Sequence, residues 1–128
     1  YKIDLSNVAK KNHTIECRVN AENAKDFSPS PGKIKFINVP GGRGIRIDTA
    51  LYTNYKVNPH YDSLILKIIS KGKDRDESIA IMKRALEEII IDGINTNIEL
   101  HKWILRQKDF ISGVYNTNWL EKNINKFN

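Results

Sequence analysis

The chain has 128 residues, of which 40% are hydrophobic and 28% charged, a composition typical of one compact domain with an ordinary core. No apolar stretch approaches the roughly 18 residues of a membrane span, so we expect a single domain over residues 1–128 with no membrane segment. The net charge of +6 would favour nucleic-acid binding if the basic residues were gathered on one face. Acidic residues interleave with them, which indicates a mixed, solvated surface.

The first residue and the cysteine content give further expectations. The chain begins with Tyr1, and its first residues lack the basic-then-apolar layout of a signal peptide, so we expect it to be cut from a longer chain. Cys17 is the only cysteine, which excludes an internal disulfide and a cysteine-rich zinc site and is compatible with a reducing cytoplasm. The three histidines share no metal-ligand spacing, so we predict no metal site.

The first half of the chain has the patterns of β-strands. Residues 15–20 alternate strictly between apolar and polar side chains, as in a half-buried strand with its apolar side in the core. Further strands are expected at about residues 33–39 and 45–51, and the glycine-rich turn at 40–44 predicts that these two form a hairpin. The apolar run at 64–69 predicts a strand that is covered on both faces or at its ends.

The second half has the period of helices. Apolar side chains recur at helical spacing in residues 79–90, with Asp74 placed to cap the start of this helix and Gly93 to close its end. Capping-box spacing at Thr96-Asn97-Ile98-Glu99 predicts a second helix over about 96–106, and residues 118–121 predict a short third. The predicted fold class is therefore α+β, with a mostly antiparallel sheet followed by about three helices.

Arg18 is the polar residue on which the pattern is most informative. Strand alternation places it on one face with Glu16 and Asn20, where a guanidinium can present its fixed set of donors to an anion. The alternative, which spacing alone favours, is a surface arginine paired with Glu16 or Glu22. From the pattern alone, the chain could also be a basic α+β module that binds nucleic acid without catalysis.

A long motif carries a family resemblance. Residues 13–22 read HTIECRVNAE and resemble the signature H-x-[IV]-E-C-R-[IV]-N-A-E of biotin carboxylases. The motif is followed in the same order by PSPGKI at 29–34, GGRGIR at 41–46, HYDS at 60–63 and IDGI at 91–94. The match spans nearly the whole chain. It resembles the C-terminal domain shared by acetyl-CoA carboxylase and the related pyruvate and acyl-CoA carboxylases.

The resemblance implies an ATP-dependent enzyme. In this family an ATP-grasp core activates bicarbonate as carboxyphosphate, and biotin attached to a carrier protein captures the released carbon dioxide. The implied cofactors of the full-length enzyme are biotin, ATP and Mg. The implied partners are its own ATP-grasp core, a biotin carboxyl carrier protein and a carboxyltransferase component, which would feed acetyl-CoA carboxylation in fatty acid synthesis. Because the ATP-grasp region is expected upstream of Tyr1, the isolated chain should bind no cofactor and be inactive.

The resemblance also implies a catalytic role for one arginine. Arg18 matches the arginine that faces the active site, contacts bicarbonate and biotin, and stabilises negative charge developing on the ureido oxygen. A group that stays charged at working pH suits that role. Asp62 matches an aspartate near that arginine and is expected to orient Arg18 or tune its charge.

Two further pairs of residues match family positions outside that centre. Thr117 and Asn118 fall where the family closes over the adenine of ATP, often with an aliphatic residue and a histidine. Arg43 and Arg46 fall in the glycine-rich hairpin through which the family's bacterial dimers pack. Arg46 matches an arginine of that interface, whereas an aromatic side chain is common at the position of Arg43. The resemblance therefore implies a possible homodimer through this hairpin.

Overall fold

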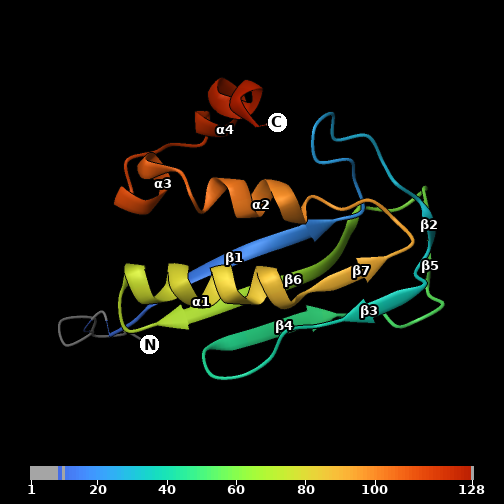
Figure 1. The fold of residues 1–128 in the computed structure, drawn as a ribbon, viewed down its shortest axis with the longest axis horizontal. Helices are drawn as coiled ribbons and strands as arrows, with labels where there is room; N and C mark the ends of the chain where they lie inside the picture. Colours follow the sequence, from blue (N-terminus) through green and yellow to red (C-terminus); the bar gives the residue numbers. More distant parts are fainter. Residues whose placement is uncertain (1–8, 10, 128) are drawn as a thin grey trace, which may run out of the picture.

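The computed structural model describes residue 9 and residues 11–127 (Figure 1). The strands are β1 (His13–Asn20), β2 (Gly32–Lys33), β3 (Phe36–Asn38), β4 (Ile45–Thr49), β5 (Lys56–Val57), β6 (Leu64–Gly72) and β7 (Ile90–Asp92). The helices are α1 (Arg75–Glu88), α2 (Ile98–Ile104), α3 (Lys108–Ser112) and α4 (Trp119–Asn123), followed by a 3-10 turn, η1 (Ile124–Lys126). Among the described residues, every helix is too short or too polar to span a membrane.

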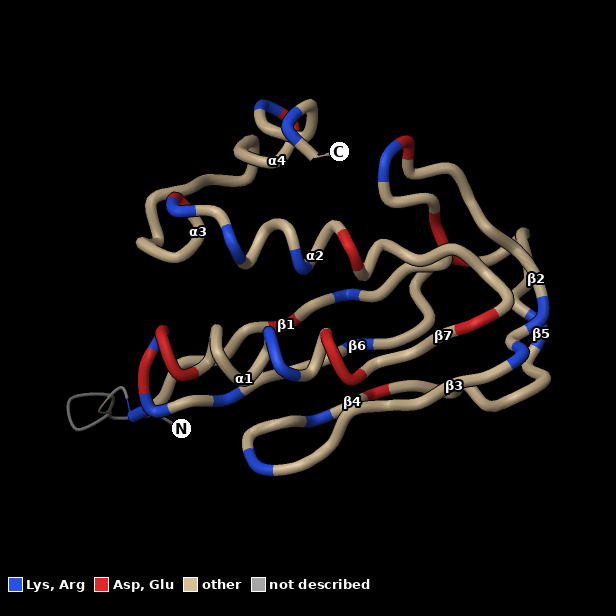
Figure 2. The backbone as a smooth tube through the Cα atoms, viewed as in Figure 1, with Lys and Arg blue, Asp and Glu red and all other residues tan. Residues whose placement is uncertain are grey.

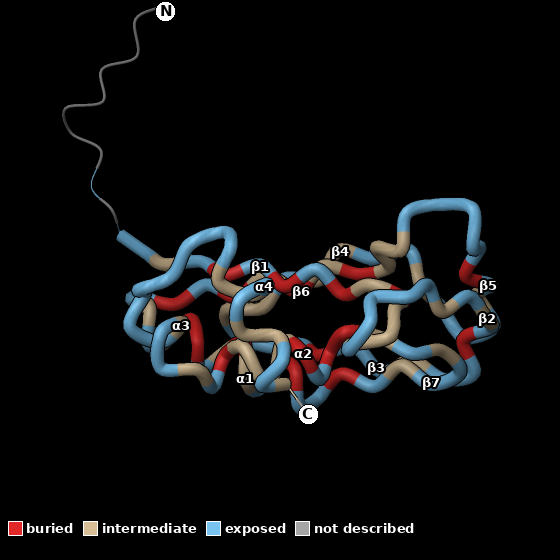
Figure 3. Tube along the Cα trace, turned by 90° about the horizontal axis from the view of Figure 1, so that it is seen from above, coloured by how far each residue is buried: buried red, intermediate tan, exposed pale blue. Residues whose placement is uncertain are grey.

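A three-stranded sheet and one long helix form the centre of the fold. The strands lie in the order β1–β6–β4 with antiparallel neighbours, and α1 packs against this sheet. In Figure 3 these strands lie on one side of the molecule and α1 and α2 on the other. Two smaller antiparallel pairs, β2–β5 and β3–β7, extend the structure at one end (Figure 1). The predicted α+β class, with antiparallel strands followed by helices, is confirmed.

The main core lies between the three-stranded sheet and α1. Alternate strand residues and every third or fourth helix residue point to the same side, and each large aliphatic side chain buried this way contributes about 1.5–3 kcal/mol. The buried side chains include Ile15, Cys17, Val19, Leu66, Ile68, Ile79, Met82, Leu86 and Leu105. Cys17 is 4% exposed, which confirms that the apolar side of the first strand faces the core. The opposite face of β1, β6 and β4, which α1 does not cover, is called the open face below.

The predicted hairpin between residues 33–39 and 45–51 is wrong. β3 pairs with β7 and β4 pairs with β6, so the intervening loop carries the chain from one sheet to another. Pairing with β6 turns the inward side chains of β4 toward the main core. The carbonyl of Gly44 accepts a hydrogen bond from the Lys71 amide at 2.8 Å, which extends the contact between β4 and β6.

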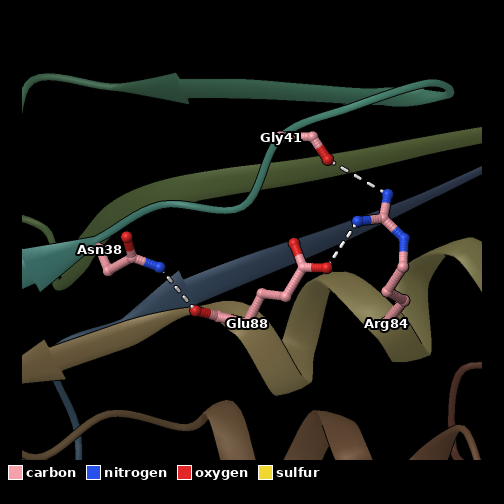
Figure 4. A network of polar contacts seen from close by, with 4 residues as sticks. All are labelled: Asn38, Gly41, Arg84 and Glu88. Atoms are coloured by element: carbon pink, nitrogen blue, oxygen red, sulfur yellow. Dashed lines mark hydrogen bonds and ion pairs between the residues drawn. The ribbon is translucent and has the colours of Figure 1, made fainter.

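A side chain of α1 also anchors the glycine-rich loop (Figure 4). The guanidinium of Arg84 donates to the Gly41 carbonyl at 3.1 Å and forms an ion pair with Glu88 at 2.7 Å. The Asn38 amide donates to the Glu88 carbonyl at 2.9 Å. The end of α1 therefore holds both the loop and β3.

Helix α1 begins as predicted but ends earlier. The Asp74 carboxylate accepts a hydrogen bond from the Glu77 amide at 2.9 Å, which confirms the N-terminal cap. The helix ends at Glu88, and residues 90–92 form β7, so the prediction that Gly93 closes this helix is wrong. Three consecutive isoleucines at 89–91 favour extended backbone, because β-branched side chains fit a pleated strand better than a helix.

The later helices differ from the prediction in two respects. Helix α2 begins at Ile98, and the side chain of its N-cap residue Asn97 makes no capping hydrogen bond, so the predicted capping box is wrong. Helix α3 was not predicted. The Arg75 guanidinium attaches it to α1, donating to the carbonyls of Phe110 and Ile111 and lying 4.9 Å from the centre of the Phe110 ring. The short helix predicted at 118–121 is confirmed as α4.

Candidate functional site

Arg18 lies in β1, at the edge of the three-stranded sheet, and belongs to a row of charged side chains that crosses the open face. It stands directly opposite Lys67 of β6, and Lys67 stands opposite Asp48 of β4. Arg18 is exposed, and within the described part of the chain its guanidinium makes no ion pair or hydrogen bond. The alternative that pairs it with Glu16 or Glu22 does not hold, because neither carboxylate forms an ion pair with Arg18 among the described residues. The Glu22 carboxylate accepts hydrogen bonds from Ser63 and Asn20 instead.

The neighbouring charges leave the row around Arg18 positive. Arg46 forms a bidentate ion pair with Asp48, in which the two carboxylate oxygens lie 2.9 and 3.1 Å from the guanidinium nitrogens. The hydrogen bond to Asp48 and the charge of that carboxylate raise the pKa of Arg46. Like charges directly opposite each other on adjacent strands destabilise the pair. An anion bound beside Arg18 and Lys67 would relieve that repulsion.

The backbone of Arg18 is held from the side of α2. The Arg18 carbonyl accepts hydrogen bonds from Asn97 Nδ2 at 3.2 Å and from His101 Nε2 at 2.9 Å. Burial lowers the pKa of His101, and its hydrogen bond with the Arg18 carbonyl opposes that shift. The patterns in the sequence did not identify Asn97 or His101 as part of the site. The capping-box spacing placed Asn97 at the start of the predicted helix and gave no sign of its contact with β1.

Asp62 lies in the loop before β6, beside the end of β1. This loop is tied to β1 by the Ala21 amide, which donates to the Ser63 carbonyl at 2.8 Å. The Asp62 carboxylate accepts from the Leu64 amide at 3.1 Å. Among the described residues no hydrogen bond or ion pair joins Asp62 to Arg18. The orienting role of Asp62 therefore stays a prediction.

Thr117 and Asn118 lie in a different part of the molecule. Both are exposed in the turn before α4, where the Asn118 amide donates to Asn116 at 3.1 Å. In Figure 1, α4 lies on the far side of α2 from β1. The rings of Trp119 and Trp103 lie 5.8 Å apart and attach α4 to α2. The structure therefore does not bring these two residues to Arg18, and their adenine-binding role stays a prediction.

The two arginines assigned to a dimer contact occupy different settings. Arg43 is exposed in the loop before β4, and Arg46 lies on the open face in its contact with Asp48. In Figure 2 basic and acidic positions are interspersed over the described part of the chain, as expected from the sequence. Within residues 9 and 11–127, no group of three or more His, Cys, Asp or Glu side chains could hold a metal ion.

Comparison with known proteins connects this geometry to a family. A family model described as the biotin carboxylase C-terminal domain matches residues 16–122. The biotin carboxylase of Pseudomonas aeruginosa is 51% identical over 122 residues, which are 95% of this chain and 27% of that protein. The chain therefore spans about a quarter of the length of this relative.

Solved structures give the same result. A biotin carboxylase–β,γ-ATP complex from Campylobacter jejuni is 43% identical with a TM-score of 0.85, covering 88% of this chain and 25% of that one. The biotin carboxylase domain dimer of the Hydrogenobacter thermophilus 2-oxoglutarate carboxylase, in complex with MgADP, ADP and bicarbonate, is 41% identical with a TM-score of 0.86. That match covers 90% of this chain and 26% of the other. This chain belongs to the biotin carboxylase C-terminal domain family.

Proposed function

We propose that residues 1–128 are one domain of an ATP-dependent biotin carboxylase, which uses bicarbonate to carboxylate biotin on a carrier protein. The observation that carries this proposal is the exposed guanidinium of Arg18, which has no acidic partner within the described residues and lies beside Lys67 on the open face. A permanently charged group with a fixed planar set of donors suits an oxyanion that develops during reaction. The related Hydrogenobacter domain is in complex with bicarbonate, which supports an anion as the occupant.

Arg18 is the residue of this chain to which we assign the chemistry. Its guanidinium would bind bicarbonate and the ureido oxygen of biotin, and it would stabilise the negative charge that develops on that oxygen. Asp62, in the loop held beside β1, would orient Arg18 or tune its charge. Thr117 and Asn118 would lie near the adenine of ATP, in the turn before α4.

The remaining requirements of the reaction would come from other parts of the enzyme. ATP, Mg and biotin would be bound with an ATP-grasp core, a biotin carboxyl carrier protein would bring the biotin, and a carboxyltransferase component would use the product. The isolated chain would then be inactive. Two copies of the enzyme would meet through the loop of Arg43 and the strand of Arg46, where Asp48 compensates one of the two charges. The related Hydrogenobacter domain is described as a dimer, which supports this arrangement.

We further propose that the parent complex carboxylates acetyl-CoA in the cytoplasm, for fatty acid synthesis. The support is the 51% identity to the Pseudomonas aeruginosa biotin carboxylase over 95% of this chain. The similarity to the domain of a 2-oxoglutarate carboxylase makes a keto acid the rival final acceptor. Assaying the complete complex with acetyl-CoA and with 2-oxoglutarate separates the two.

Substitution of Arg18 in the full-length enzyme tests the central assignment. Carboxylation of biotin is measured with ATP and bicarbonate in saturating amounts. Arg18→Ala should lower kcat by about a hundredfold or more, the effect of removing a donor to a developing oxyanion. Arg18→Lys should lie between, because it keeps the charge and loses the planar donor set. Arg106→Ala is the matched control, since this exposed arginine contacts Glu87 of α1 and has no contact with β1 among the described residues. Unchanged carboxylation by Arg18→Ala would refute the assignment.

A nucleic-acid-binding module is the alternative function. It predicts that duplex DNA binds the chain and that the affinity falls steeply between 50 and 200 mM salt, by roughly a thousandfold for six or more phosphate contacts. The interleaved charges of Figure 2 lead us to expect no such binding. Fluorescence anisotropy with a labelled duplex at the two salt concentrations distinguishes the alternatives.

A further inference from the structure

Arg18 lies in an edge strand, so its outward backbone groups have no neighbouring strand to pair with. In the order β1–β6–β4, β1 has β6 on one side only. The pairing of β1 with β6 also shifts between Val19 and Asn20, just after Arg18. Edge strands present a row of free amide and carbonyl groups. The position of the Arg18 side chain therefore depends on what occupies this edge.

Helix α2 supplies the missing partners at this place. The Asn97 side chain accepts from the Asn20 amide at 2.9 Å and donates to the Arg18 carbonyl at 3.2 Å. The backbone N–H of Asn97 donates to the Asn20 carbonyl at 3.3 Å, so Asn97 bonds to β1 much as a neighbouring strand would. One turn further along α2, the His101 ring donates to the Arg18 carbonyl at 2.9 Å.

The surroundings of Asn97 and His101 suit residues that hold the β1 backbone rather than residues that take part in the reaction. Asn97 is 7% exposed, so its side-chain amide is shielded from water that would compete for these hydrogen bonds. Burial lowers the pKa of His101, which favours a neutral ring, and the carbonyl partner requires the proton of that ring to sit on Nε2. Both donors converge on one oxygen atom, the carbonyl of Arg18.

We propose that Asn97 and His101 are positioning residues for Arg18. By fixing the peptide plane that follows Arg18, they fix the direction in which its Cα–Cβ bond leaves the strand toward the open face. The guanidinium has no partner among the described residues, so before substrate binds only the backbone sets the position and direction from which this side chain starts. This inference rests on the proposed function of Arg18. Its consequence is that α2, which touches no substrate in the proposed reaction, controls the rate of that reaction.

Substitutions of His101 in the full-length enzyme distinguish a role in positioning Arg18 from a role in filling space. His101→Gln keeps a side-chain N–H that reaches the carbonyl, and it should keep kcat for biotin carboxylation within about twofold. His101→Leu keeps the volume without a donor and should lower kcat by about tenfold or more, because small misplacements of a catalytic group cost up to a hundredfold. The KM for ATP should not change. Glu99→Leu is the matched control, since Glu99 is an exposed residue of α2 whose carboxylate pairs with Lys102 rather than with β1.

The same measurements in an Arg18→Ala background decide the mechanism. If His101 acts through Arg18, His101→Leu should cause no further loss when Arg18 is already absent. An equal loss in both backgrounds, or wild-type kcat for folded His101→Leu, would overturn the positioning role. Should His101→Leu not fold, as judged by its thermal unfolding, His101→Asn replaces it, because the shorter amide does not reach the carbonyl. Failure of the proposed function itself would look different: Arg18→Ala alone would then leave kcat unchanged.

Discussion

Gly93 is the position at which a single methyl group should disturb the fold most clearly. It follows β7 with a φ of +105°, and a β-carbon built there would overlap the Lys33 carbonyl oxygen and lie 3.0 Å from the Lys35 nitrogen. A side chain in left-handed backbone costs roughly 1–2 kcal/mol, and forcing the neighbouring backbone to move costs about 1–3 kcal/mol. Gly93→Ala should therefore lower the free energy of unfolding by about 2–5 kcal/mol.

Urea denaturation followed by circular dichroism measures this loss. With a slope of about 2 kcal/mol per molar urea, the midpoint should fall by about 1–2.5 M. Gly41→Ala is the matched control, because a β-carbon there meets nothing within 4 Å. Its free energy of unfolding should change by no more than about 0.5 kcal/mol, as expected of a surface substitution, and its midpoint by no more than about 0.25 M. A Gly93→Ala midpoint no lower than that of Gly41→Ala would refute the steric argument.

Two predictions follow from titratable groups. Burial raises the pKa of the Cys17 thiol to about 12, and the charge of Glu16 adds to the shift. At pH 8 the folded chain should therefore react with a thiol reagent about a thousandfold more slowly than the chain unfolded in urea. Equal rates would contradict the burial of Cys17. Burial lowers the pKa of His101, so the unfolded chain binds a proton that the folded chain does not between that lowered pKa and about 6.5. The free energy of unfolding should be largest above this window and fall as the pH falls through it. Urea midpoints at pH 7.5, 6.5 and 5.5 measure the effect, and a fall just as large in His101→Gln would exclude His101 as the cause.

The parts of the fold that depend on neighbouring residues could be predicted from the sequence. Alternation placed Cys17 in the core, and the spacing of Asp74 and Glu77 identified the start of α1. The end of α1 could not be predicted in this way, because Ile89 and Ile90 fit both the helical period and a strand. The strand partner of Ile90 is Asn38 of β3, about fifty residues earlier in the chain, and local patterns do not contain that contact.

The candidate site, like the fold, could be predicted from the sequence only in part. Arg18 could be assigned from a long sequence motif, and alternation placed it correctly on the exposed side of its strand. Its two backbone partners come from residues about eighty positions further along the chain, Asn97 and His101. No periodic pattern links a helix side chain to the carbonyl of a distant strand. The contact results from the packing of α2 against the edge of β1, which only the tertiary structure defines.

The covered edge of β1 also affects the tendency of this chain to aggregate. Asn97 and His101 occupy the carbonyls and amides that a foreign strand would need in order to add itself to the sheet there. The opposite edge of the same sheet is β4, only five residues long and bearing the charges of Arg46 and Asp48. Short, charged edge strands resist unwanted pairing. Mutations that detach α2 should therefore promote aggregation through the strand that carries Arg18.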